Sequence, residues 1–101
     1  MDEHVVDNRQ ARRFEIYHGD DLAGFAEYHL RGNRIAVLHT EIVPRLKGRG
    51  LAGKLARHML DDARRRRREV LPYCTFIRWW ISEHPDYLDL VPHALRAGFH
   101  L

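Results

Sequence analysis

The chain has 101 residues, and its 17 lysines and arginines outnumber its 14 acidic residues to give a formal net charge of +3. A hydrophobic content of 45% excludes a disordered chain, because such chains lack the apolar surface that offsets the entropy cost of ordering. The length predicts one domain over residues 1–101. No apolar run reaches the roughly 18 residues of a membrane span. The lone Cys74 cannot form an internal disulfide, so a cytoplasmic location is expected.

The first half of the chain predicts strands. Residues 1–11 are polar and are expected to form a lead-in without a secretory signal. Apolar and polar residues then alternate in three segments, as in half-buried strands. These segments are residues 12–18, 22–30 and 35–43. Short connections, including a Gly32-Asn33 turn, predict that the three strands pair as an antiparallel meander.

The second half predicts helices around one further strand. Leu51, Leu55 and Met59 lie four residues apart and indicate an amphipathic helix over residues 50–67. A short strand is expected at residues 70–74, followed by a helix that ends before Pro85. The fold class is therefore α/β of the α+β type, with a mixed, mostly antiparallel sheet of about four strands and two main helices. The strands on either side of the first helix should be parallel.

The connection between the third strand and the first helix carries the clearest functional signal. The first N–H groups of a helix have no partner within the helix and form its positive end. Gly48 and Gly50 let the backbone approach a ligand closely, and Lys47 and Arg49 add positive charge. This segment predicts a phosphate-binding site at a helix N-terminus. The spacing of its glycines and Lys54 does not fit the P-loop of nucleoside triphosphatases.

The pattern Arg45-x-x-Gly48-x-Gly50 resembles the pyrophosphate loop of the GCN5-related N-acetyltransferases, which reads [QR]-x-x-G-x-[GA]. Over residues 12–91 the chain is similar to the small YjdJ-type subgroup of that superfamily. Three further motifs carry this resemblance, namely His39-Thr40-Glu41, Cys74-Thr75-Phe76 and His84-Pro85-Asp86-Tyr87. The resemblance implies a minimal acetyltransferase fold, without the first helical pair and the final strands that usually help to hold the acceptor.

The resemblance also implies acetyl-coenzyme A as cosubstrate. The strand end at residues 41–43 would pair with the pantetheine arm, and N–H groups of residues 47–52 would hold the pyrophosphate. The implied coenzyme A contacts are Ile42, Val43, Arg45, Lys47, Gly48, Arg49, Gly50, Leu51, Ala52, Cys74 and Phe76.

Three residues are candidates for catalysis, and each has a structural alternative. Glu41 would be the general base for the acceptor amine, or a solvent-facing position on its strand. Cys74 would be a nucleophile that carries the acetyl group, or a small buried residue. Tyr87 would protonate the leaving thiolate, or lie at the edge of the core. Direct attack by the amine and an acetyl-cysteine route both stay open.

The function expected from these features is transfer of an acetyl group from acetyl-coenzyme A to an amine, on a small molecule or a protein lysine. One alternative is a non-catalytic protein that binds acyl-coenzyme A as a sensor. Another is a nucleic-acid-binding module that uses the five arginines of residues 64–68. That run is interpreted instead as a solvated helix end, where cations suit the helix dipole. The eight histidines do not show metal-ligand spacing, so no metal site is expected.

Overall fold

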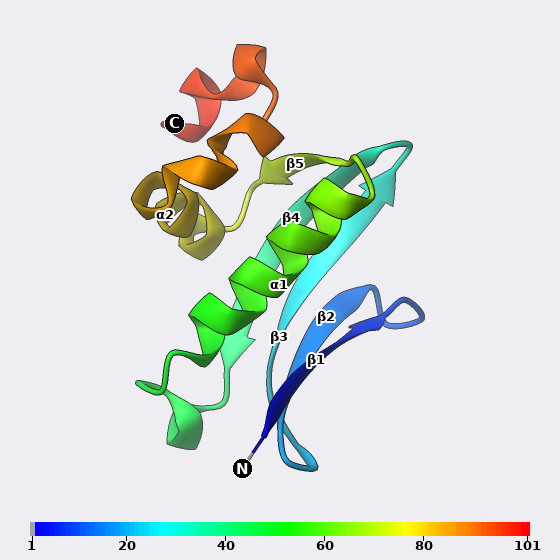
Figure 1. Cartoon of the computed structure of the whole chain (residues 1–101), viewed down its shortest axis with the longest axis vertical. Coiled ribbons are helices and arrows are strands. Elements are labelled where there is room, and N and C mark those ends of the chain that lie inside the picture. Colours follow the sequence, from blue (N-terminus) through cyan, green and yellow to red (C-terminus); the bar gives the residue numbers. More distant parts are fainter. Residues whose placement is uncertain (1) are drawn as a thin grey trace.

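The computed structural model describes residues 2–101 and contains a five-stranded sheet in the order β1-β2-β3-β4-β5 (Figure 1). Its strands are β1 (Glu3–Asn8), β2 (Arg13–His18), β3 (Asp21–Arg31), β4 (Arg34–Ile42) and β5 (Glu69–Pro72). The first four strands form an antiparallel meander, and β5 runs parallel to β4. The predicted α+β fold and its parallel crossover are confirmed, with one strand more than expected.

Two α-helices follow the meander. Helix α1 (Leu51–Arg65) connects β4 to β5, and α2 (Thr75–Glu83) follows β5. A 3-10 turn, η1 (Pro44–Leu46), precedes α1, and the chain after α2 forms the 3-10 segments η2 (Pro85–Leu90), η3 (His93–Leu95) and η4 (Ala97–Phe99). Strand β5 ends at Pro72, two residues earlier than predicted, and Cys74 is the N-cap of α2. Helix α2 ends at Glu83, just before Pro85, as the sequence predicts.

The additional strand is β1, so the interpretation of residues 1–11 as a lead-in is wrong. Residues Glu3–Asn8 pair with β2 along their whole length. The strand escaped prediction because its inward positions include acidic residues. Glu3 forms an ion pair with Lys54 of α1, and Asp7 accepts a hydrogen bond of 2.6 Å from the Tyr28 hydroxyl. These partners lie far away in the sequence, so the local pattern shows only a polar segment.

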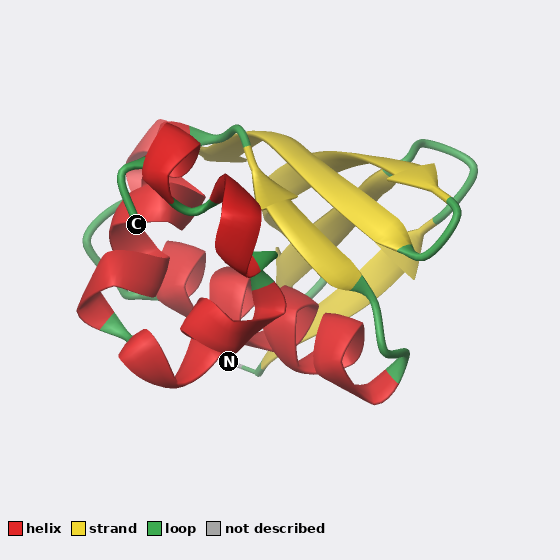
Figure 2. Ribbon diagram, turned by 90° about the horizontal axis from the view of Figure 1, so that it is seen from above, coloured by secondary structure: helices red, strands yellow, loops and turns green. Residues whose placement is uncertain are grey.

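The core lies on one face of the sheet, under α1. Its apolar side chains include Phe14 and Ile16 of β2 and Leu55 and Met59 of α1, all fully buried. Figure 2 shows the helices gathered on this side of the sheet. Within residues 2–101, no helix covers the opposite face. Helix α2 packs beside α1 through the buried Trp80, whose ring lies 5.3 Å from the Arg57 guanidinium of α1.

A β-bulge in β4 changes which residues share a face. Glu27 of β3 pairs with His39, whereas its neighbour Tyr28 pairs with Val37, so Leu38 is the extra residue. Val37 and Thr40 consequently both point toward α1. Strand β5 pairs with β4 only as far as Val37, and the two strands then diverge. This divergence positions the candidate site.

Candidate functional site

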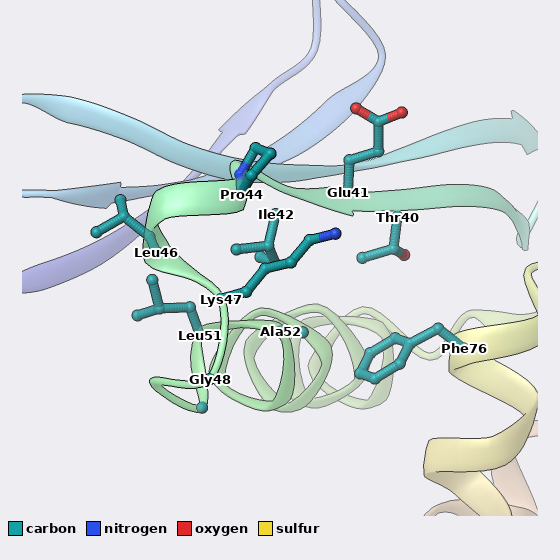
Figure 3. A pocket seen from close by; sticks show the side chains of 11 residues that line it. Thr40, Glu41, Ile42, Pro44, Leu46, Lys47, Gly48, Leu51, Ala52 and Phe76 are labelled. Atoms are coloured by element: carbon teal, nitrogen blue, oxygen red, sulfur yellow. The ribbon is translucent and has the colours of Figure 1, made fainter.

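A groove of about 500 Å³ lies where β4 and β5 separate (Figure 3). Its walls are the free end of β4, the η1 turn, the start of α1 and the first turn of α2. The side chains and backbone that line it come from Thr40, Glu41, Ile42, Pro44, Leu46, Lys47, Gly48, Gly50, Leu51, Ala52 and Phe76. The groove therefore joins the predicted glycine loop to a strand edge in one continuous surface.

The edge of β4 presents backbone groups to this groove. The Val43 N–H donates to the Ala23 carbonyl at 2.7 Å, which fixes the phase of the antiparallel hydrogen bonds to β3. Because these bonds alternate along a strand, Glu41 and Val43 direct their backbone toward β3. Thr40 and Ile42 direct theirs toward the groove, beyond the last residue that β5 pairs. The resemblance implies the pantetheine contact at residues 41–43 and does not include Thr40. Of these residues, Ile42 directs its backbone toward the groove, whereas Glu41 and Val43 direct theirs toward β3.

The glycine loop bends sharply into α1. Gly48 and Gly50 have φ angles of 82° and 74°, in the left-handed region that favours glycine. Gly50 is the N-cap, and its carbonyl accepts the first helical hydrogen bond, from Lys54 N–H at 3.2 Å. The N–H groups of the first turn, including Leu51 and Ala52, thus have no carbonyl partner within the helix. They lie at the groove and carry the positive end of the helix dipole.

Charge at the groove comes mainly from Lys47. Its side chain extends across the groove toward β4 (Figure 3). Arg45 turns instead to the start of β3, where its guanidinium lies 3.5 Å from the Asp21 carboxylate. Arg49 is exposed and does not line the groove. Of the predicted coenzyme A contacts, the structure brings seven to the groove: Ile42, Lys47, Gly48, Gly50, Leu51, Ala52 and Phe76.

Cys74 lies just behind the groove wall. The residue is 6% exposed, and its Sγ is 3.4 Å from the Thr40 Oγ1. The Cys74 N–H donates to the Val37 carbonyl at 2.9 Å, which is the last backbone link between β4 and the segment that follows β5. Thr40 therefore stands between the sulfur and the groove. The only feature of the sequence that pointed to a role for Thr40 at this site was its place within the His39-Thr40-Glu41 motif.

Glu41 points to the other side of β4. Its carboxylate turns away from Lys47 and Thr40 (Figure 3). On the uncovered face of the sheet, Glu41 Oε1 lies 2.9 Å from His39 Nε2, and both side chains are exposed. The prediction that these two residues share a strand face is confirmed. Glu41 is nevertheless among the residues that line the groove.

Tyr87 is separate from this groove. Its hydroxyl donates to Asp61 Oδ1 at 2.7 Å and accepts from Arg57 at 3.2 Å. Its ring packs against Trp80, with ring centroids 5.2 Å apart. Burial, followed by the bond to Asp61, raises the pKa of Tyr87. The structure thus places Tyr87 in the contact between α1 and η2 and gives its hydroxyl two protein partners.

Other kinds of site find little support in the part of the chain that the structure describes. Among residues 2–101, no cluster of three histidine, cysteine or acidic side chains could hold a metal ion. No helix in the same range is both long and apolar enough to cross a membrane.

The mixed sheet, the diverging strand pair and the glycine loop at a helix N-terminus define an α+β domain of the acetyltransferase type. The family model of the GCN5-related N-acetyl-transferases matches residues 13–90, and the chain belongs to this family. A protein from Staphylococcus aureus that is described as GCN5-like, solved by NMR in solution, has a similar fold. The two align with a TM-score of 0.68 and 20% identity, over 88% of this chain and 87% of the other. No curated protein matches the sequence.

Proposed function

We propose that this protein transfers the acetyl group of acetyl-coenzyme A to an amine. One observation carries the proposal: the free backbone edge of β4 and the start of α1 form a single groove. Family membership supports acetyltransferase chemistry, which is typical of this superfamily.

The groove suits the chemistry of coenzyme A at both ends. The amide groups of a pantetheine arm can pair with the backbone of Thr40 and Ile42 as an added strand would. A pyrophosphate suits the N–H groups of Leu51 and Ala52, with Lys47 as counter-charge. A β-carbon added to Gly48 or Gly50 would meet no protein atom within 4 Å, so there is space for a ligand beside both residues.

Two chemical routes are available at the Thr40 end of the groove. In the direct route, Glu41 removes a proton from the acceptor ammonium group, and the amine nitrogen bonds to the thioester carbonyl carbon. The bond from that carbon to the coenzyme A sulfur then breaks, and the second proton lost by the nitrogen passes to the departing thiolate. In the covalent route, the Cys74 sulfur bonds to that carbonyl as the bond to the coenzyme A sulfur breaks, and the thiol proton passes to the departing thiolate. The amine then attacks acetyl-Cys74 and returns a proton to its sulfur.

A second candidate function is binding of acyl-coenzyme A without transfer. It is favoured by the position of Cys74 behind Thr40 and by the two partners that the Tyr87 hydroxyl already has. In that case the groove would bind its ligand, whereas Glu41 and Cys74 could be replaced without consequence for binding.

Two measurements test the proposal and separate the candidates. A ligand at 100 times its Kd stabilises a native protein by about 2.7 kcal/mol, so coenzyme A should raise the melting temperature clearly. Release of free thiol from acetyl-coenzyme A should then depend on an added amine, tested with lysine-containing peptides and small amines. An unchanged melting curve at millimolar coenzyme A would overturn the proposal. Stabilisation without thiol release would support the sensing candidate instead.

A further inference from the structure

A second hollow, of about 670 Å³, lies on the uncovered face of the sheet. It runs over β3, β4 and β5, from the turn between β3 and β4 toward the point where β4 and β5 diverge. Its floor is apolar and comes from Ala36, Leu38, Leu71 and Tyr73. Leu38 and Tyr73 are 49% and 56% exposed, which is high for side chains of this size. The Tyr73 ring packs edge-on against Phe99, with centroids 5.2 Å apart.

The far end of this hollow is positively charged. His29, Arg31 and Arg34 form its rim, and among the described residues that line it none is acidic. Arg31 and Arg34 stand directly opposite each other in the β3–β4 pairing. Like charges in that position destabilise a sheet. Glu69 Oε1 lies 2.9 Å from the Arg34 Nε, whereas Arg31 forms no ion pair within residues 2–101, so this pair of arginines keeps one positive charge without a counter-ion. A further anion would complement this pair.

The near end of the hollow lies on the same face of β4 as His39 and Glu41, the proposed base. Leu38 precedes His39, and Tyr73 precedes Cys74, so the floor ends at the divergence of β4 and β5. Arg34 lies four residues before Leu38 on β4, a distance of about 13 Å at about 3.3 Å per residue. An extended peptide covers the same length in about four residues. One end of such a peptide would be at Arg31 and Arg34, while the other lay beside Leu38, on the face where His39 meets Glu41.

We propose that this hollow binds the polypeptide that carries the acceptor lysine. An acidic residue three or four positions from the lysine would sit between Arg31 and Arg34. An apolar residue between them would pack on Leu38 and Tyr73. This inference rests on the proposed function and narrows its acceptor to a lysine in an acidic segment of protein.

Short peptides with a blocked N-terminus and a single lysine test this arrangement. The probe has the sequence Asp-Ala-Leu-Ala-Lys, and it is compared with a peptide that has Asn for Asp and with one that has Asp directly before Lys. Binding is measured by fluorescence anisotropy of labelled peptides, with saturating coenzyme A present. We expect the probe to bind roughly fivefold more tightly than either comparison peptide, as suits a carboxylate between two arginines.

Two matched variants of the protein complete the test. Arg31→Ala should abolish the preference for the probe, and it should melt no lower than wild type because it removes one of two opposed like charges. Arg65→Ala, on α1, is the matched control because it changes the net charge by the same amount. This variant should prefer the probe peptide as strongly as wild type does. Asp62, the ion-pair partner of Arg65, keeps Arg66 at 3.1 Å.

Equal binding of the three peptides would overturn the inference, as would an equal loss of preference in both variants. Stabilisation by coenzyme A is measured in the same samples. If coenzyme A raises the melting temperature and the peptides bind equally, only the assignment of this hollow fails. If coenzyme A leaves the melting temperature unchanged, the proposed function fails, whatever the peptides do.

Discussion

Substituting Gly50→Ala tests whether the backbone at the start of α1 binds the ligand. Gly50 has φ 74°, and a β-carbon in the left-handed region costs about 1–2 kcal/mol. The added methyl would meet no protein atom within 4 Å, so the strain stays within the residue and the methyl projects into open space at the groove. Gly32, with φ 60° and equally open space, is a matched control in the turn between β3 and β4.

We expect both variants to lose about 1–2 kcal/mol of unfolding free energy, with about 4–8 °C of melting temperature lost per kcal/mol. Only Gly50→Ala should weaken the binding of coenzyme A, because its methyl group keeps a phosphate away from the N–H groups of the first turn of α1. Loss of one charge-assisted hydrogen bond, about 1.5–3 kcal/mol, raises Kd roughly ten- to a hundredfold. Calorimetric titration measures Kd. Equal losses of affinity in Gly50→Ala and Gly32→Ala, or wild-type affinity in Gly50→Ala, would refute the reasoning.

Three more predictions concern single side chains. If the covalent route operates, wild type should gain one acetyl group from acetyl-coenzyme A by intact-protein mass spectrometry, and Cys74→Ser and Cys74→Ala should gain none; an unacetylated wild type with near-normal turnover in Cys74→Ala would eliminate that route. Burial and the hydrogen bond to Asp7 raise the pKa of Tyr28 to about 12 from 10.0. The neutral Tyr28 hydroxyl therefore stabilises the folded state fully below pH 10, and this stabilisation declines as the pH rises toward 12. In denaturant titrations, the unfolding free energy of wild type should fall by roughly 2–3 kcal/mol between pH 10 and pH 12, whereas that of Tyr28→Phe should fall much less. Trp80→Ala should cost about 3–5 kcal/mol and Trp79→Ala less than about 0.5, because their exposed fractions are 4% and 57%; similar melting of the two would contradict this account of how α2 packs.

The glycine loop could be predicted because its geometry is local. A strand end, glycines at fixed spacing and an amphipathic run set the start of a helix within a few residues. The positive φ of Gly48 and Gly50 and the helix start at Leu51 agree with that interpretation. Amphipathic periodicity likewise found the core face of α1, since Leu55 and Met59 are both buried.

Features that depend on distant partners could not be predicted. The bulge at Leu38 follows from how β4 pairs with β3, and strict alternation would have put Thr40 on the face opposite to Val37. Tyr87 shows the same limit. Its hydroxyl binds Asp61, 26 residues earlier, and no local pattern indicates that contact.

The short pairing of β4 with β5 has a consequence for the dynamics of the groove. Antiparallel neighbours in this sheet share six, six and eight register pairs, whereas β4 and β5 share four. One wall of the groove, β4, is therefore fixed along its whole length by β3. The other wall begins with α2, which follows this short parallel seam. Segments with few backbone links open at lower free energy than the rest of a protein, so β5 and α2 should exchange their amide protons sooner than β2 and β3. A ligand that bridges both walls would then slow amide exchange in α2 far more than in the meander. It would link β4 to α2 where, within residues 2–101, the sheet has no backbone hydrogen bonds between these two walls.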